Sequence, residues 1–239
     1  MVLRVDRRFR GPSDSGNGGY VCGLVAARVG AAVGGFAAEV TLRTPPPLDT
    51  AMSVVTDDPG MVRLSNGDVM VAEGARSPLT VDAVPPVDRS SARTASASYP
   101  GLLRHPFPEC FVCGPDRAPD DGLRVFPGRL GDGRTACTWT VSADLAGRPE
   151  FVWAVLDCPG GWSADIEGRP MVLGRMTGRL TALPDVGEEC VVMGLLLRSE
   201  GRKTWTATTA YGADGRELGR AHSTWLTVNG RRSGRNRGT

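Results

Sequence analysis

The chain has 239 residues, enough for one large domain or two of ordinary size, and its 41% hydrophobic content is that of a soluble globular protein. The 28 basic and 26 acidic residues nearly cancel, to a net charge of +2. Much of the basic excess lies between residues 231 and 237, which argues against a broad nucleic-acid-binding face.

The sequence contains no pattern of a signal peptide or of a transmembrane segment, and its six cysteines are therefore expected to be reduced thiols. We expect a cytoplasmic protein with neither a nucleic acid nor a membrane as partner. Only two histidines, His105 and His222, are present, and this narrows the chemistry that the chain can perform.

The first half reads as a strand, a helix and several more strands. Residues 2–9 alternate as a short strand does, and a helix follows from Asn17, which is a plausible N-cap. Strand-like segments then cover 36–43, 52–56, 61–64 and 69–75, with an Asn-Gly turn between the last two. Residues 77–106 are rich in Pro, Ser, Ala and Arg and have little periodicity, which is typical of a linker.

The second half repeats this plan. Short strands at 123–126 and 135–141 lead into an apolar helix that begins at Pro149. We expect Pro159 to kink or end that helix, with Gly160 and Gly161 relieving the crowding that follows. Strands are then predicted over 171–180, 190–197, 203–211 and 217–228, with an Asp-Gly turn between the last two.

The two helices can be aligned residue by residue. Tyr20–Val25 aligns with Phe151–Leu156. Both segments consist of an aromatic residue, a valine, a variable residue, a small residue and two branched apolar residues. In that register Gly30 falls on Gly161. An internal repeat of this kind predicts two packed copies of one unit, and helices covered by antiparallel strands indicate an α+β fold.

The segments G-G-Y-V-C-G-L and A-V-L-D-C-P-G-G-W resemble the helix motifs of acyl-CoA thioesterase-type hotdog proteins, broadly H-G-G-x-x-x-x-L-A-D-x-x-x-G. The resemblance implies a tandem (double) hotdog: two long helices, each wrapped by an antiparallel β-sheet, packed as an intramolecular pseudo-dimer. The expected divisions are an N-terminal hotdog over 1–76, a linker over 77–108, a C-terminal hotdog over 109–228 and a basic disordered tail over 229–239.

Asp157 is the first residue expected to carry chemistry. It is the one ionisable group in an otherwise apolar helical run, and an unpaired charge in such surroundings is costly unless it finds a partner or changes its pKa. The alternative is a structural carboxylate that binds nearby backbone groups.

The resemblance also implies how the site is divided. In the family motif a glycine pair opens the helix and an acid follows two turns later. Here the first half keeps the glycine pair as Gly18 and Gly19 but has Ala26 at the position of the acid. The second half keeps the acid as Asp157 but has Pro149 and Glu150 at the positions of the glycines.

We therefore predict a single composite site, in which Gly18 and Gly19 supply amide donors for a thioester oxygen and Asp157 activates water or attacks the carbonyl. Asn17 is included, with a helix cap as its alternative role. The two glycines can instead serve only close helix–sheet packing.

Five further residues are candidates for substrate binding. Arg175 is a charge within a strand-like segment, and Lys203 with Arg202 can meet coenzyme A phosphates or form an exposed turn pair. The aromatic residues of the two helix segments complete the set: Tyr20, Trp153 and Trp162.

Cys110 and Cys113, with His105 upstream, have metal-ligand spacing. A structural zinc ion usually needs four ligands, and no second Cys-x-x-Cys motif is present, so that Cys137 and Cys158 would have to converge from elsewhere. No metal ligand is assigned on this basis, and the alternative is a turn with two buried thiols.

These features predict hydrolysis of an acyl thioester, either acyl-CoA or an acyl-carrier protein, without a cofactor and in a chain that can form a homodimer. The alternative is a non-hydrolytic acyl-binding or tailoring protein, including a dehydratase- or cyclase-like one. The dehydratases of this fold to which we compare it use a histidine near the helix, whereas His105 lies in the linker and His222 on the last strand.

Overall fold

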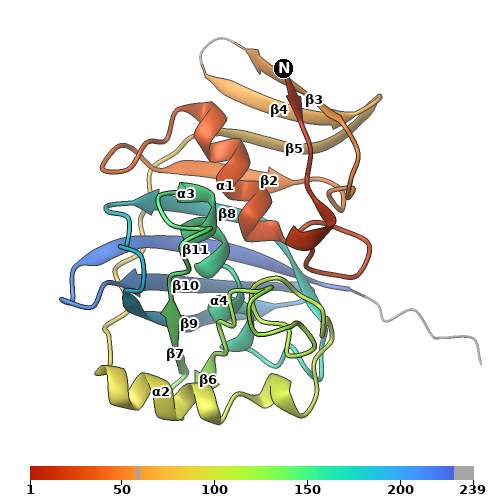
Figure 1. Ribbon diagram of the computed structural model, residues 1–239. Helices are drawn as coiled ribbons and strands as arrows, with labels where there is room; N and C mark the ends of the chain where they lie inside the picture. The colour runs from red at the N-terminus through yellow and green to blue at the C-terminus, as the bar shows by residue number, and fades with distance from the viewer. Residues whose placement is uncertain (58–59, 229–239) are drawn as a thin grey trace, which may run out of the picture.

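The computed structural model describes residues 1–57 and 60–228 (Figure 1). The basic tail predicted at 229–239 lies outside these residues. In the part of the chain that is described, no helix has the length and apolar character needed to span a membrane.

Within the described residues the strands form one antiparallel sheet, in the order β1-β3-β4-β5-β2-β8-β11-β10-β9-β7-β6. The first half contributes β1 (Val2–Leu3), β2 (Ala38–Leu42), β3 (Met52–Asp57), β4 (Met61–Asn66) and β5 (Val69–Arg76). The second half contributes β6 (Gly128–Arg129), β7 (Arg134–Thr140), β8 (Met171–Leu180), β9 (Glu189–Glu200), β10 (Lys203–Tyr211) and β11 (Glu217–Thr227).

The two halves of the sheet have the same order of strands when each is followed outward from the middle. β2 and β8 pair at the centre, with Ala38 opposite Gly178, and each is followed by the last, the middle and the first strand of its own meander. The predicted hairpin turns are confirmed between β4 and β5 and between β10 and β11. Their glycines, Gly67 and Gly215, have positive φ angles of 57° and 84°, which favour this residue.

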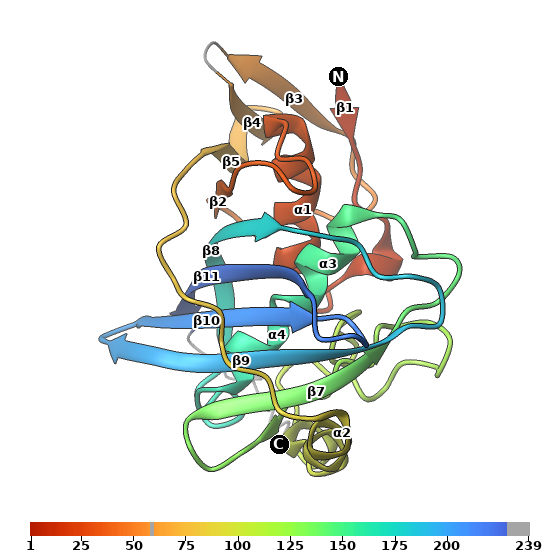
Figure 2. The ribbon, with the colours of Figure 1, turned by 90° about the vertical axis from the view of Figure 1, so that its left-hand side faces the viewer.

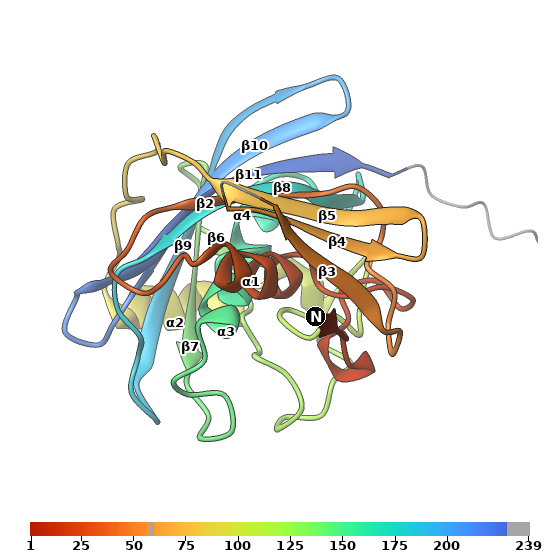
Figure 3. The same cartoon turned by 90° about the horizontal axis from the view of Figure 1, so that it is seen from above.

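The first helix forms as predicted. α1 (Gly18–Val29) begins after Asn17, whose Oδ1 accepts a hydrogen bond from the Tyr20 amide at 2.9 Å, and it ends at Gly30 with a φ of 87°. A short 3₁₀ turn, η1 (Arg7–Phe9), precedes it. Figures 1 and 3 place α1 and α3 beside each other on one side of the sheet.

The second helix is not the long helix that the resemblance implies, but the interruption expected at Pro159 is present. It is divided into α3 (Pro149–Val155) and α4 (Cys158–Trp162). Pro159 lacks an N–H group and its ring would clash with the carbonyl four residues earlier, so a continuous helix cannot pass through it. Hydroxyl groups of the sheet satisfy carbonyl groups at the break: Thr208 Oγ1 donates to Leu156 O at 2.8 Å, and Thr135 Oγ1 to Pro159 O at 2.9 Å.

The segment predicted as a linker is part of the fold. It contains α2 (Arg89–Ala97) and the 3₁₀ turn η2 (Pro100–Leu102), and Figure 2 shows the chain crossing the strands of the second half before it reaches α2. A small apolar cluster joins it to β7, β9 and β10 through Val84, Ala92, Ala95, Ala136, Val191, Met193, Ala207 and Tyr211. Residues of the linker therefore pack on one face of β7, β9 and β10.

We expect Tyr211→Phe to lower the free energy of unfolding by about 1 to 2 kcal/mol, because it removes a donor from a buried carbonyl group. The Tyr211 hydroxyl donates to Val84 O at 2.7 Å, while Thr209 Oγ1 accepts from Val84 N at 2.9 Å. Urea unfolding measures the loss, and limited proteolysis between residues 77 and 88 should become faster. Unchanged stability together with unchanged cleavage would contradict this account of the segment.

Candidate functional site

The candidate site lies where α1 of the first half meets α3 of the second, and glycine allows the two helices to approach closely. A Cβ atom built at Gly19 would lie 2.7 Å from the carbonyl oxygen of Trp153, and one built at Gly23 would lie 2.7 Å from the Cα atom of Glu150. Both distances are shorter than van der Waals contact, so side chains at these positions would push the helices apart.

Asp157 is held at this helix contact by two hydrogen bonds from the other half of the chain. Its Oδ2 atom accepts from the Gly19 amide at 2.9 Å and from Asn17 Nδ2 at 3.0 Å. The break between α3 and α4 places this carboxylate at the N-terminal end of α1, where amide groups lack partners within the helix. The predicted meeting of Gly19 and Asp157 is therefore present.

The other oxygen of the carboxyl group, Oδ1, is buried and has no hydrogen-bond partner among the described residues. Asp157 as a whole is 2% exposed. Burial raises its pKa to about 7, while the hydrogen bonds from Gly19 and Asn17 act in the opposite direction. One oxygen of this carboxyl group is thus held by two hydrogen bonds, and the second has none.

Asn17 serves both helix α1 and Asp157. Its Oδ1 atom caps the helix by accepting from the Tyr20 amide, and its Nδ2 atom donates to the carboxylate. The sequence offered a cap and a functional group as alternatives, whereas the geometry allows one side chain to act as the cap and to orient the acid.

The two glycines differ in their surroundings. A Cβ atom at Gly18 would lie 2.8 Å from the Cβ atom of Leu173 on β8, so this glycine allows the helix to pack on the sheet. Gly19 faces α3, and its amide already donates to Asp157. Gly19 therefore both packs against α3 and donates a hydrogen bond to Asp157, whereas Gly18 packs against β8.

The three aromatic candidates are buried around the site and not exposed in an open cleft. Tyr20 stacks on Phe151 with ring centroids 5.6 Å apart, and burial is the main cause that raises its pKa to about 12. Trp153 packs its ring against Gly178 of β8. Trp162 lies edge-on to Tyr99, with ring centroids 4.6 Å apart.

The two basic candidates lie elsewhere. Arg175 is on β8 and is exposed; it pairs with Glu39 at 3.3 Å and donates to Thr41 Oγ1 at 2.9 Å, both on β2. Lys203 is the first residue of β10 and is exposed. Within the described residues, neither basic group forms a hydrogen bond or ion pair with Asp157 or Gly19.

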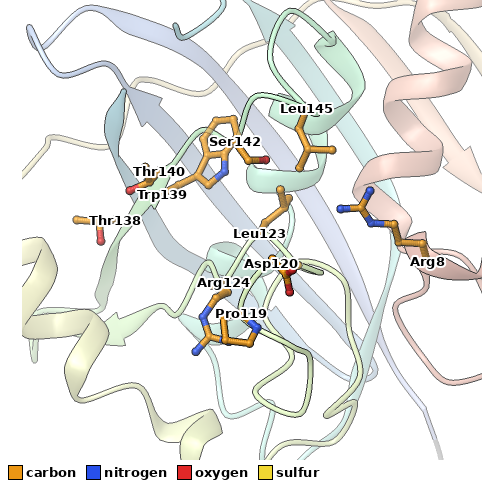
Figure 4. A pocket seen from close by; sticks show the side chains of 11 residues that line it. Arg8, Pro119, Asp120, Leu123, Arg124, Thr138, Trp139, Thr140, Ser142 and Leu145 are labelled. Carbon is orange, nitrogen blue, oxygen red and sulfur yellow. The ribbon is translucent and has the colours of Figure 1, made fainter. Parts of the chain in front are cut away.

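A cavity of about 270 Å³ opens nearby, between η1 and residues of the second half (Figure 4). Arg8 lies on one side of it, and Leu123, Trp139 and Leu145 are among the residues on the other. The Arg8 side chain also lies over Phe9, which belongs to a cluster of aromatic rings with Tyr20, Phe111 and Phe151. This aromatic cluster joins the wall of the cavity to the start of α1.

One of the two cysteines named as possible further ligands does converge on the Cys-x-x-Cys motif. Cys158 lies with Cys110 and Cys113, and their sulfur atoms all lie within 4.8 Å of one another. Cys137, the other residue that was considered, is buried apart from them and points its sulfur toward Val192 O.

No protein-family model matches the sequence, and no curated protein matches it. Solved structures do match over nearly the whole chain. They include a candidate thioesterase from Novosphingobium aromaticivorans (14% identity, 95% of each chain, TM-score 0.63) and a hot-dog-fold protein of unknown function from Alicyclobacillus acidocaldarius (11% identity, 95% of this chain and 92% of that one, TM-score 0.61). A candidate thioesterase II from Thermobifida fusca matches 95% of this chain and 92% of its own, with 12% identity and a TM-score of 0.60. These likenesses confirm the predicted tandem hotdog fold.

Proposed function

We propose that the protein hydrolyses an acyl thioester, of coenzyme A or of an acyl-carrier protein, at a single site between its two halves. The observation that carries the proposal is the carboxyl group of Asp157, oriented through Oδ2 by Gly19 and Asn17 and with Oδ1 unpaired in a buried environment. A carboxylate of this kind is suited to accept a proton from water or to attack a carbonyl carbon.

We further propose that the halves are copies of one unit, over residues 1–76 and 109–228, related by a pseudo-twofold axis. Tyr20 and Phe151, which are equivalent in the aligned helices, stack on each other. Gly19 approaches Ala154 while Gly23 approaches Glu150, and these two contacts exchange under the same alignment. Reciprocal contacts of this kind are expected at an interface with twofold symmetry.

The axis would relate the Asp157 site to a second position that has neither group. There the residue equivalent to Asp157 is Ala26, and the residue equivalent to Gly19 is Glu150. A carboxylate and an N-terminal amide therefore come together once in each chain, which supports one site per chain.

In the proposed reaction Oδ1 of Asp157 takes a proton from water as the water oxygen attacks the thioester carbon. The carbonyl oxygen becomes negatively charged and takes the Gly19 amide as its donor, in place of Oδ2. Asn17 keeps the carboxylate in position during this exchange. Cleavage of the carbon–sulfur bond then gives a carboxylic acid and a thiol, and Asp157 returns its proton to the departing sulfur.

One observation favours a second candidate, an acyl-binding protein that does not hydrolyse its ligand. The Gly19 amide is not free, since it donates to Asp157 at 2.9 Å, and both groups are buried. If a ligand cannot displace Oδ2 from the Gly19 amide, this hydrogen bond only stabilises the contact between the two halves, and no hydrolysis takes place.

A panel of acyl-CoA and acyl-pantetheine thioesters, monitored for release of free thiol, separates the two candidates. Hydrolysis of at least one substrate well above the buffer rate is expected. Tight binding of one acyl group in calorimetry, with no thiol released from any substrate, would replace the hydrolase by the binding protein.

A further inference from the structure

Three thiols from two distant segments meet beside the candidate active site. Cys110 and Cys113 belong to the chain between η2 and β6, and Cys158 is the first residue of α4. Their sulfur atoms all lie within 4.8 Å of one another, with Cys110 and Cys158 at 3.9 Å. All three side chains are buried and none forms a disulfide.

These spacings fit thiolates that share one metal ion. Zinc–sulfur bonds of about 2.3 Å at tetrahedral angles place two sulfur ligands about 3.8 Å apart. The distance between Cys110 and Cys158 is 3.9 Å, whereas a disulfide would bring the two atoms to about 2.05 Å. A disulfide would also leave the third thiol without a role.

The segment that carries the first two cysteines has little regular structure to hold it. No helix or strand is found in the described chain between Leu102 and Gly128, yet the segment buries Phe111, Val112, Leu123 and Val125 in the core. Long irregular segments inside a compact domain are uncommon, and a bound metal ion is one way to fix them.

The turn around Cys110 and Cys113 is tight. The Gly114 amide donates to Cys110 O at 2.8 Å, and a Cβ atom at Gly114 would lie 2.4 Å from Pro108 O. Only glycine fits this position, so the backbone closes directly behind the two thiols. The Cys-x-x-Cys-Gly sequence thus forms a compact loop that presents both sulfur atoms toward Cys158.

His105 completes the surroundings of the cluster as a hydrogen-bond donor. Its Nδ1 atom accepts from the Phe107 amide at 2.9 Å, so the ring proton of the neutral imidazole is on Nε2. Nε2 lies 3.3 Å from the Cys113 sulfur, and the ring packs edge-on against Trp162. A donor in this position stabilises a thiolate and tunes a metal that the thiolate binds.

We propose that Cys110, Cys113 and Cys158 bind a zinc ion as thiolates, with His105 donating a hydrogen bond from Nε2 to the Cys113 sulfur. Each thiol releases its proton when the ion binds. Among the described residues, no further His, Cys, Asp or Glu offers a ligand atom within 4.8 Å of all three sulfur atoms. The fourth position is therefore left to a small ligand such as water.

The ion would tie the irregular segment to the start of α4. Cys158 follows Asp157 directly, and the Cys110 sulfur lies 3.9 Å from Asn17 Nδ2, which orients the Asp157 carboxylate. The metal ion would thus fix the backbone at Cys158, directly after Asp157, and would lie beside the Asn17 side chain that donates to the Asp157 carboxylate.

The test is the metal content of the full chain, purified without chelator and measured by plasma mass spectrometry. We expect about one zinc ion per chain, and a loss of at least tenfold in Cys113→Ser and in Cys158→Ser. Cys137→Ala, which removes a buried thiol outside the cluster, should keep its zinc. Because the cluster variants can fail to fold, the wild-type protein provides a second measurement: reloading with Co²⁺ should give the thiolate charge-transfer band of a sulfur-rich tetrahedral site.

His105→Gln should retain the ion with weaker affinity, because this histidine is not assigned as a ligand. Complete loss of zinc from that variant would overturn the three-thiolate set. The site itself would be ruled out by wild-type protein that neither contains zinc nor takes it up from excess, or by a Cys110–Cys158 disulfide in the native chain. None of these results depends on thioester hydrolysis.

Discussion

Asp157→Asn is expected to reduce thioester hydrolysis by about a hundredfold to ten-thousandfold while the protein stays folded. The asparagine can turn its amide oxygen toward Gly19 and Asn17, and so keep both hydrogen bonds that Oδ2 now accepts. Its NH2 group then occupies the place of Oδ1, where it can neither take a proton from water nor attack a carbonyl. The loss should appear in kcat, because the substrate-binding surfaces do not change.

The matched control is Asp214→Asn, in the exposed turn between β10 and β11, which should leave the rate unchanged. Circular dichroism and thermal unfolding establish that both variants are folded. An Asp157→Asn variant that is folded and fully active would remove Asp157 from the reaction and leave it as a structural carboxylate.

Gly19→Ala is expected to lower the free energy of unfolding by about 3 kcal/mol. The new methyl group would lie 2.5 Å from Asp157 Cβ and 2.7 Å from Trp153 O, and it meets backbone that cannot rotate away. Alanine favours a helix more than glycine does, by about 1 kcal/mol, so the measured loss is the net of the two effects. Chemical denaturation with a fixed m-value measures it.

Gly18→Ala provides the comparison, because it brings the same gain in helix propensity at the adjacent position. Its methyl group would lie nearest to side-chain atoms of Leu173, at 2.8 Å, and of Leu42, at 3.3 Å, and these contacts are longer than the contacts of 2.5 Å and 2.7 Å at Gly19. We expect a smaller loss of stability. Equal losses in the two variants would mean that the contact between α1 and α3 is no tighter than the contact between α1 and β8.

Much of the fold could be predicted because its signals are local. The cap at Asn17, the apolar run after Pro149 and the Asn-Gly and Asp-Gly turns each depend on a few neighbouring residues. The meeting of Gly19 and Asp157 followed from the alignment of the two helices together with the resemblance to the hotdog motif, which implies that the halves pack as a pseudo-dimer. It needed no knowledge of side-chain positions.

The features that were missed depend on contacts between distant segments. Helix α2 is short and has alanine as its only apolar residue type, and those alanines find their partners on strands that follow 40 or more residues later in the chain. The sequence left open whether Cys137 or Cys158 joins Cys110, and the fold selects Cys158 because α4 begins where Pro159 ends α3. The engagement of the Gly19 amide by Asp157 is likewise a matter of tenths of an ångström, which sequence patterns do not record.

The central pairing of β2 with β8 has a consequence for how the molecule unfolds. Strands from the two halves hydrogen-bond to each other in the middle of one sheet, and the helices of both halves lie against each other beside it. Neither half can melt without breaking that seam, so calorimetry should record a single cooperative transition, with equal van't Hoff and calorimetric enthalpies. A chain cut between the halves should leave two fragments that are structured only when mixed.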